Sequence, residues 1–158
     1  MKKILSVKQA IKIARKLKDH NKTVVVAGGF FDILHAGHIE FLENSRKQGD
    51  YLFVLLEDDK KAREKGVNRP VNSQKNRAKV LLSLQSVDCV VLLRNMTNDT
   101  LYDKIIIQVA PTIIATTYGD PYVEHKKRQA RLVKGRVVYV IRRIKNHSTT
   151  KLMRMINI

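Results

Sequence analysis

Residues 23–38 read TVVVAGGFFDILHAGH, a short apolar run followed by glycines, a single acid and two histidines. A continuous valine-rich run of this length is typical of a buried parallel strand. The two glycines after it permit a tight turn and a close approach of a ligand to the backbone. If a helix begins near Gly37, the imidazoles of His35 and His38 lie at its N-terminal end, where free N–H groups favour phosphate.

Four further short apolar runs predict additional strands, separated by longer stretches with helical spacing. We expect strands at residues 51–56, 87–93, 112–116 and 136–141, and helices at 7–18, 38–48, 99–109 and 121–133, with two more after Ser73 and from about Thr149. This alternation predicts an α/β fold in which helices cover both faces of a five-stranded parallel sheet. In such sheets ligands bind beyond the carboxyl ends of the strands, where the two histidines also lie.

Local signals mark the ends of several of these helices. Ser6 is a candidate N-cap for the helix over 7–18, and Ser73 is a candidate N-cap for a helix with Ala78, Leu81 and Leu82 facing inward. Gly49 would end the helix over 38–48. The length of 158 residues suits one domain, and no linker is visible along the chain.

The chain is strongly basic, with 31 Lys and Arg residues against 14 Asp and Glu and a formal charge of +17. The basic residues concentrate in residues 1–22, 60–79 and 126–154, which indicates either a solvated surface or attraction for anions such as nucleic acid, acidic lipid or phosphorylated small molecules. No apolar run is long enough for a membrane span, and no secretory signal is visible. The single cysteine, Cys89, favours a reducing compartment, so we expect a cytoplasmic protein.

The histidine segment also carries a recognisable pattern. Gly29, Phe31, Asp32, His35, Gly37 and His38 match G-x-F-D-x-x-H-x-G-H, which resembles the signature of the HxGH nucleotidyltransferase superfamily in its cytidylyltransferase-like branch. The resemblance implies a Rossmann-like three-layer α/β/α sandwich and a single nucleotidyltransferase domain over residues 1–158. It implies catalytic roles for His35 and His38, and nucleotide contacts for Gly29, Phe30, Phe31, Gly37 and His38.

A second motif of this superfamily, of the S-T-T type, precedes its last helix. Here Ser148, Thr149 and Thr150 occupy that place, and their hydroxyl and N–H groups suit a phosphate at a helix N-terminus. The superfamily more often has glycine and an apolar residue just before this motif, whereas this chain has Asn146 and His147. The resemblance implies nucleotide contacts for the Ser-Thr-Thr residues and for Gly119 and Asp120, a pair whose simpler interpretation is a turn.

Basic residues between the two motifs resemble the phosphate-binding loop of the superfamily. Lys65, Arg69 and Arg77 are therefore candidates to bind the phosphorylated substrate, and Lys65 is also a candidate catalytic residue; the simpler interpretation is a solvated basic loop. Asp59 follows the strand at 51–56 and is a further substrate-binding candidate at the ligand edge. Asp32 is a candidate in the same site, where it could orient a histidine or hold the turn.

The N-terminal helix, the run G-x-F-D-I-L-H-A-G-H, the segment R-P-V-N over residues 69–72 and the downstream run with Arg77, Leu84 and Val87-Asp88 cover nearly the whole chain. With them the chain looks most like the heptose 1-phosphate adenylyltransferase domain of ADP-heptose synthesis, which serves lipopolysaccharide cores. The resemblance implies transfer of a nucleoside monophosphate from an NTP, with ATP favoured, to a sugar phosphate, with D-glycero-D-manno-heptose 1-phosphate favoured. It also implies Mg²⁺ bound with the NTP, no metal site made by the protein alone, and a homodimer. Glycerol-3-phosphate cytidylyltransferases and FAD synthetases share most of the pattern and stay open as alternatives.

Two hypotheses from other functional classes have weaker support. A non-catalytic nucleic-acid-binding module would explain the charge of +17, but the basic runs lack interleaved aromatic residues. A fragment of a class I aminoacyl-tRNA synthetase would explain two histidines, but the chain has no K-M-S-K-S-like motif. We therefore expect neither a nucleic-acid partner nor a membrane partner.

Overall fold

A six-stranded parallel sheet forms the centre of the computed structural model, which describes residues 1–142 and 149–155. The described strands are β1 (Lys3–Ser6), β2 (Val24–Gly29), β3 (Tyr51–Leu56), β4 (Cys89–Leu92), β5 (Ile113–Tyr118) and β6 (Arg136–Arg142). They are ordered β1-β4-β3-β2-β5-β6, and every neighbouring pair is parallel.

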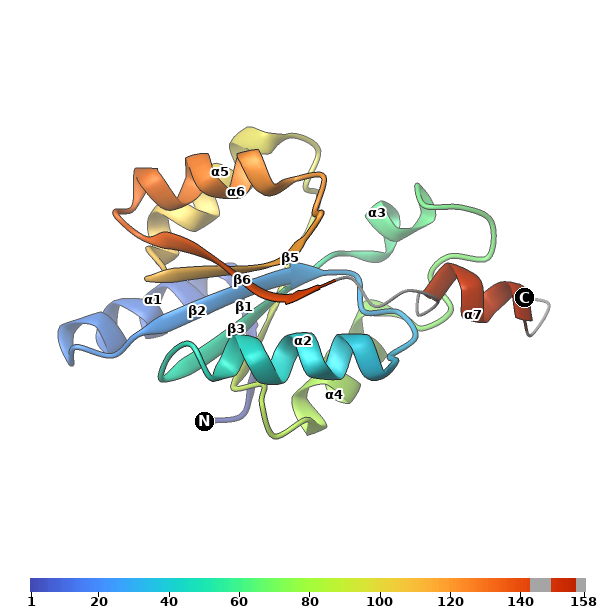
Figure 1. The fold of residues 1–158 in the computed structure, drawn as a ribbon, viewed down its shortest axis with the longest axis horizontal. Coiled ribbons are helices and arrows are strands. Elements are labelled where there is room, and N and C mark those ends of the chain that lie inside the picture. Colours follow the sequence, from blue (N-terminus) through green and yellow to red (C-terminus); the bar gives the residue numbers. More distant parts are fainter. Residues whose placement is uncertain (143–148, 156–158) are drawn as a thin grey trace.

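Helices cover both faces of this sheet (Figure 1). One face packs against α1 (Val7–Asp19), α5 (Asp99–Val109) and α6 (Val123–Leu132), and the other packs against α2 (Ala36–Arg46) and α4 (Gln74–Ser83). Side chains alternate between these two cores along a strand, as Val24 and Val26 enter the first core and Val25 and Ala27 enter the second. Two short helices, α3 (Asp59–Arg63) and α7 (Thr149–Met155), lie at the end of the sheet where the strands terminate (Figure 1).

The three-layer α/β/α arrangement confirms the predicted fold class, but the predicted number of strands was wrong. The sixth strand is β1, whose four residues KILS bury only Leu5. Because β1 is a short edge strand that pairs with β4 alone, it carries no continuous apolar run that would reveal it in the sequence. Helix α3 was also not predicted, since its five residues are mostly charged.

Most helix signals are confirmed. Ser6 forms a capping box with Gln9 at the start of α1, and Ser73 caps α4 by accepting a hydrogen bond from the Asn76 N–H. Gly49, however, lies beyond the end of α2 at Arg46. Its absent side chain serves packing, since a Cβ there would lie 2.7 Å from Cγ2 of Thr23.

The order of the strands creates a crevice at one edge of the sheet. From β2 the chain proceeds to β3 on one side, and later returns to place β5 on the other side. Strands β2 and β5 are neighbours, and the connections that follow them lead in opposite directions along the sheet. Such a switch point is where α/β sheets bind ligands. The histidine loop follows β2, and Gly119 follows β5.

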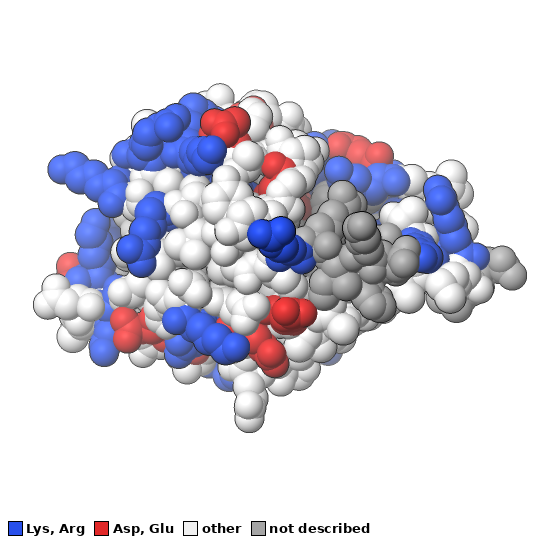
Figure 2. Space-filling model, in the orientation of Figure 1, with Lys and Arg blue, Asp and Glu red and all other residues white. Residues whose placement is uncertain are grey.

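The positive charge is spread over several elements. The exposed side of α1 carries Lys8, Lys12, Arg15, Lys16 and Lys18. Figure 2 shows basic side chains gathered toward the end of the molecule that carries α1 and over α6, with acidic residues among them. Within the described ranges, no helix is long and apolar enough to cross a membrane.

Candidate functional site

The two histidines of the motif meet at the N-terminus of α2. His35 is the N-cap residue, and the N–H groups of His38 and Ile39 both donate to its carbonyl. The two imidazole rings stack with their centroids 3.8 Å apart and their planes inclined by 22°. The site thus combines two ring systems with the positive end of an eleven-residue helix, an arrangement that favours an anionic ligand.

Burial and the neighbouring His35 lower the pKa of His38 to about 4, although a backbone hydrogen bond with Ile33 partly opposes this effect. His38 is therefore neutral near pH 7, and it would act there as a hydrogen-bonding group without a full charge.

The structure places Phe31 in contact with His38 of the histidine pair. Its backbone has a φ of +48°, which is unusual for a side chain of this size, and its ring contacts the edge of His38 with centroids 5.2 Å apart. Phe31 is buried, and a Cβ at Gly29 would lie 2.8 Å from the Phe31 ring. Both residues thus hold the histidine loop in shape, and a direct nucleotide contact from either stays a prediction.

Asp32 joins the histidine loop to the loop before α4. One carboxylate oxygen accepts from the Val71 N–H at 2.8 Å, and the other accepts from the Asn72 N–H at 2.9 Å. The Asn72 side chain in turn donates to the Asp32 carbonyl at 3.3 Å. Asp32 is buried, so of the two roles considered for it, holding the turn fits this placement better than binding substrate.

Arg77 is enclosed below the same two loops, and none of its side-chain surface is exposed. Its guanidinium donates to the carbonyls of Asn72, Phe30 and Glu57 and to the carboxylate of Asp59 at 2.7 Å. This enclosure leaves no open face for a phosphate, so Arg77 is positioned to fix the loops and not to touch substrate as the resemblance implied. Asp59 also accepts from the Gln74 N–H at 2.7 Å, and its side chain is one-third exposed.

Thr150 of the second motif lies beside the loop that carries Arg69. The Arg69 guanidinium donates to the Thr150 hydroxyl at 2.9 Å, which connects the loop before α4 to the first turn of α7. Thr149 is the first residue of α7, as expected for a helix that starts there. Ser148 and the Thr149 side chain lie outside the described residues, so their predicted nucleotide contacts stay predictions.

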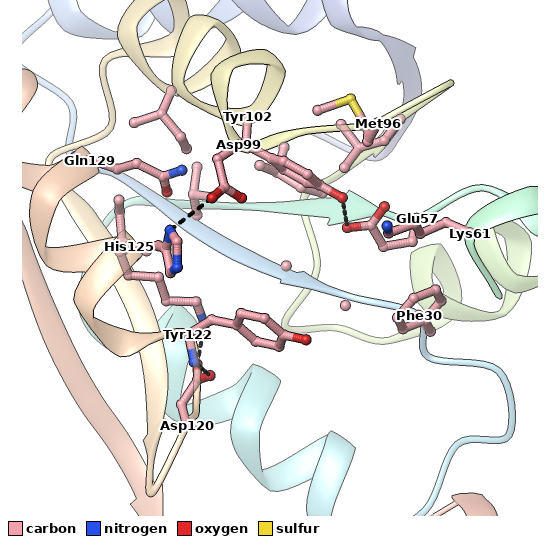
Figure 3. Close-up of a pocket in the computed structure, with 18 of the residues that line it drawn as sticks. Phe30, Glu57, Lys61, Met96, Asp99, Tyr102, Asp120, Tyr122, His125 and Gln129 are labelled. Atoms are coloured by element: carbon pink, nitrogen blue, oxygen red, sulfur yellow. Dashed lines mark hydrogen bonds and ion pairs between the residues drawn. The ribbon is translucent and has the colours of Figure 1, made fainter. Parts of the chain in front are cut away.

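A cavity of about 530 Å³ opens on the face of the sheet that α1, α5 and α6 cover. Figure 3 shows that Phe30, at one end, comes from the histidine loop, while Glu57 and Tyr102 meet at the end of β3. Lys65 lies over the Phe30 ring at 5.5 Å and lines the cavity together with Lys61. The cavity therefore begins at the histidine loop, and the side chains of Lys61 and Lys65 line it.

The turn after β5 also reaches this cavity. Gly119 has a φ of +79°, and Asp120 accepts hydrogen bonds from Thr116 at 2.6 Å, from Lys126 at 2.6 Å and from the Tyr122 N–H at 2.8 Å. Although burial raises it, these hydrogen bonds hold the pKa of Asp120 below its ordinary value. Asp120 therefore stabilises the turn, as the simpler interpretation held, and it also lines the cavity.

Several residues of the cavity were not predicted. Glu57 directly follows the predicted strand at 51–56, so it lies at the ligand edge of the sheet. The same argument that made Asp59 a candidate could have identified Glu57. Other lining residues come from α5 and α6, which carry no site signal in the sequence; they are Asp99, Tyr102, His125, Lys126 and Gln129.

Comparisons with known proteins identify a family and several relatives of this chain. The family described as cytidylyltransferase-like matches residues 26–155. A bifunctional protein HldE from Pseudomonas entomophila is 37% identical over 97% of this chain, and a second from Pseudomonas aeruginosa is 36% identical over the same share. The chain spans about a third of the length of these relatives, 32% in each. The crystal structure of a lipopolysaccharide core biosynthesis protein from Thermoplasma volcanium is 31% identical and has a TM-score of 0.63, covering 80% of this chain and 99% of that one.

Proposed function

The chain belongs to the cytidylyltransferase-like family, and from this premise we propose that it transfers a nucleoside monophosphate from an NTP to a phosphorylated acceptor. The observation that carries the proposal is the stacked pair of His35 and His38 at the N-terminus of α2. That position offers free N–H groups, the positive end of a helix and two imidazoles to a phosphoryl group.

The proposed reaction is a single displacement. A phosphate oxygen of the acceptor forms a bond to the α-phosphorus, the bond from that phosphorus to the bridging oxygen breaks, and pyrophosphate leaves with the electron pair. His35 and His38 donate hydrogen bonds to the oxygens on which charge grows in the transition state. Positioning two anions against each other supplies the remaining acceleration, so the protein needs no nucleophile.

Two sides of the histidine loop suit the two substrates. On one side, the N-termini of α2 and α7 and the guanidinium of Arg69 provide donors for the NTP phosphates. On the other side lies the cavity with Lys61 and Lys65, which we assign to the acceptor. With this division the acceptor phosphate at the cavity mouth and the α-phosphate at the helix end approach each other beside the histidines.

Mg²⁺ would enter with the NTP and neutralise part of the charge on its phosphates. Among residues 1–142 and 149–155 no group of three or more His, Cys, Asp or Glu side chains could hold a metal ion. We propose that the ion is held mainly by phosphate oxygens and water, as is common for Mg²⁺. The side chains of this chain then bind and orient the triphosphate, and they need not form a cage.

For the substrates we propose ATP and D-glycero-D-manno-heptose 1-phosphate. The support is the similarity to the HldE proteins and to the protein of lipopolysaccharide core biosynthesis. A cavity of about 530 Å³ is within the range of small-molecule sites and would hold a heptose.

The test is a screen of ATP and CTP against heptose 1-phosphate, glycerol 3-phosphate and FMN, with release of pyrophosphate as the measurement. We expect release with ATP and heptose 1-phosphate, and a loss of at least about 100-fold in kcat for His35→Ala with unchanged thermal stability. Release with another pair would correct the substrates and keep the reaction class. Equal turnover of His35→Ala and the wild type would overturn the assignment of the site.

A further inference from the structure

One wall of the cavity holds a carboxylate of which one oxygen has no hydrogen-bond partner among the described residues. The Tyr102 hydroxyl donates to Oε1 of Glu57 at 2.7 Å, as Figure 3 shows. Oε2 of Glu57 is buried and has no hydrogen-bond partner within the part of the chain that the structure describes. Burial raises the pKa of Glu57, and the Tyr102 hydrogen bond only partly opposes this effect. A buried acceptor without a donor is costly, so its retention calls for an explanation.

The surroundings of Glu57 restrict what could supply the missing donor. Lys65 lies at the rim over Phe30 of the histidine loop, Lys61 lies beside Glu57 (Figure 3), and Leu55, Ile106 and Ile114 form an apolar floor. A ligand that fills the cavity would therefore place an anionic group at the rim and a neutral hydrogen-bond donor against Glu57. A phosphorylated compound with hydroxyl groups on its carbon chain meets both requirements.

We propose that Glu57 selects acceptors that carry a free hydroxyl group away from their phosphate, with that hydroxyl donating to Oε2 of Glu57. This inference rests on the proposed function, because it takes the cavity as the acceptor site. Oε2 is covered in this structure, so the ligand reaches it by displacing a neighbouring side chain. Met96 lines the same region and is unbranched, which makes it the side chain best suited to move (Figure 3).

A purely structural role for the pair would have different consequences. Tyr102 lies in α5 and Glu57 follows β3, so their hydrogen bond also ties that helix to the sheet. If that were its whole role, removing Glu57 would lower stability and weaken all ligands of the cavity equally. The proposed role instead requires that hydroxylated and unhydroxylated phosphates respond differently.

The test measures equilibrium binding by titration calorimetry on the full chain. The probes are heptose 1-phosphate, glycerol 3-phosphate and n-propyl phosphate, the last of which keeps three carbons and the phosphate but has no free hydroxyl. The variants are Glu57→Met, which keeps an unbranched chain without an acceptor, and Tyr102→Phe, which keeps the carboxylate. Glu43→Gln on the exposed side of α2 is the matched control. Circular dichroism and the unfolding temperature report whether each variant is folded.

We expect the wild type and Glu43→Gln to bind the hydroxylated phosphates about tenfold more tightly than n-propyl phosphate. Glu57→Met should remove this preference and leave the Kd for n-propyl phosphate and the KM for the NTP unchanged. Tyr102→Phe should keep the preference, because both carboxylate oxygens stay available.

Two results would overturn the inference: a preference that survives Glu57→Met, or a wild type that does not distinguish the three probes. A Glu57-dependent preference without release of pyrophosphate from any NTP would instead refute the proposed reaction and support the assigned ligand class.

Discussion

The imidazole rings of His35 and His38 lie face to face, with centroids 3.8 Å apart and planes inclined by 22°. Two positive charges at this separation repel strongly, and burial further disfavours the charged form of His38. The pair therefore does not carry two positive charges near neutral pH, and the neutral His38 can still donate a hydrogen bond to the phosphoryl group. Such a donor has its greatest effect when negative charge develops in the transition state.

The first prediction concerns the pH dependence of stability. His38 has a pKa of about 4 in the folded protein against 6.5 for an ordinary histidine, so between these values only the unfolded chain binds the proton. The free energy of unfolding should then fall as the pH drops from 6.5 to 4, by at most about 3 kcal/mol from this group. His38→Asn should flatten this part of the curve in urea denaturation, whereas the exposed His20→Asn should leave it unchanged. Equal slopes for both variants would contradict the assigned pKa.

The second prediction separates two arginines that look alike in the sequence. Arg77→Lys should lower the free energy of unfolding by about 3 kcal/mol, because the carbonyls of Phe30 and Asn72 and the carboxylate of Asp59 lose a buried donor. Arg69→Lys should change it by less than about 0.5 kcal/mol, since Arg69 lies at the surface and contacts Thr150. Urea denaturation with a common m-value distinguishes the two, and similar losses would argue against the positioning role of Arg77.

The sequence allowed much of the fold to be predicted, because the strongest physical signals are local. Residues 99–109 were predicted as a helix and form α5 with the same bounds, and residues 51–56 form β3 as predicted. The strand over Lys3–Ser6 was missed because an edge strand needs only one buried side chain. The hydropathy pattern of these four residues gives no indication that they pair with β4.

The candidate site likewise has one part that the sequence predicted and another part that it did not. The histidine pair is local, so its spacing and its place before a helix were visible in the sequence. The enclosure of Arg77 and the pairing of Glu57 with Tyr102 depend on contacts between residues that are 20 and 45 positions apart in the sequence. Such contacts follow from the topology of the sheet, and one sequence does not show that Arg77 of α4 turns inward.

The third prediction concerns the hydrogen bonds between the histidine loop and the loop before α4. Asp32→Asn should lower the free energy of unfolding by about 1–3 kcal/mol, because an amide offers one acceptor to the N–H groups of Val71 and Asn72 and places its own donors against them. It should also lower kcat by more than it raises either KM, since the histidines lose their fixed position. Thermal unfolding and steady-state kinetics measure the two effects. Full stability together with lost substrate affinity would instead indicate a direct substrate contact.

The fourth prediction has the opposite sign to that for His38. Burial raises the pKa of Glu57 in the folded protein above the ordinary value of 4.5. As the pH rises above 4.5 the unfolded chain releases this proton first, so Glu57 lowers the free energy of unfolding with increasing pH until the folded pKa is passed. Glu57→Gln removes the titration, and its stability relative to the wild type should increase over this window in urea denaturation. A constant difference across the window would show that the carboxyl group is not perturbed.

The last prediction addresses the contact between the second motif and the loop before α4. The Thr150 hydroxyl accepts from Arg69 at 2.9 Å, and both residues lie on the side that we assign to the NTP. Thr150→Val keeps the shape of the side chain and removes the acceptor, so the guanidinium loses its fixed position. The KM for the NTP should rise about tenfold, while the KM for the acceptor and the unfolding temperature stay near their wild-type values. Thr100→Val, in the first turn of α5, is the matched control and should leave both KM values unchanged. A rise confined to the acceptor KM would place the acceptor beside α7 and reverse the proposed division of the two substrates.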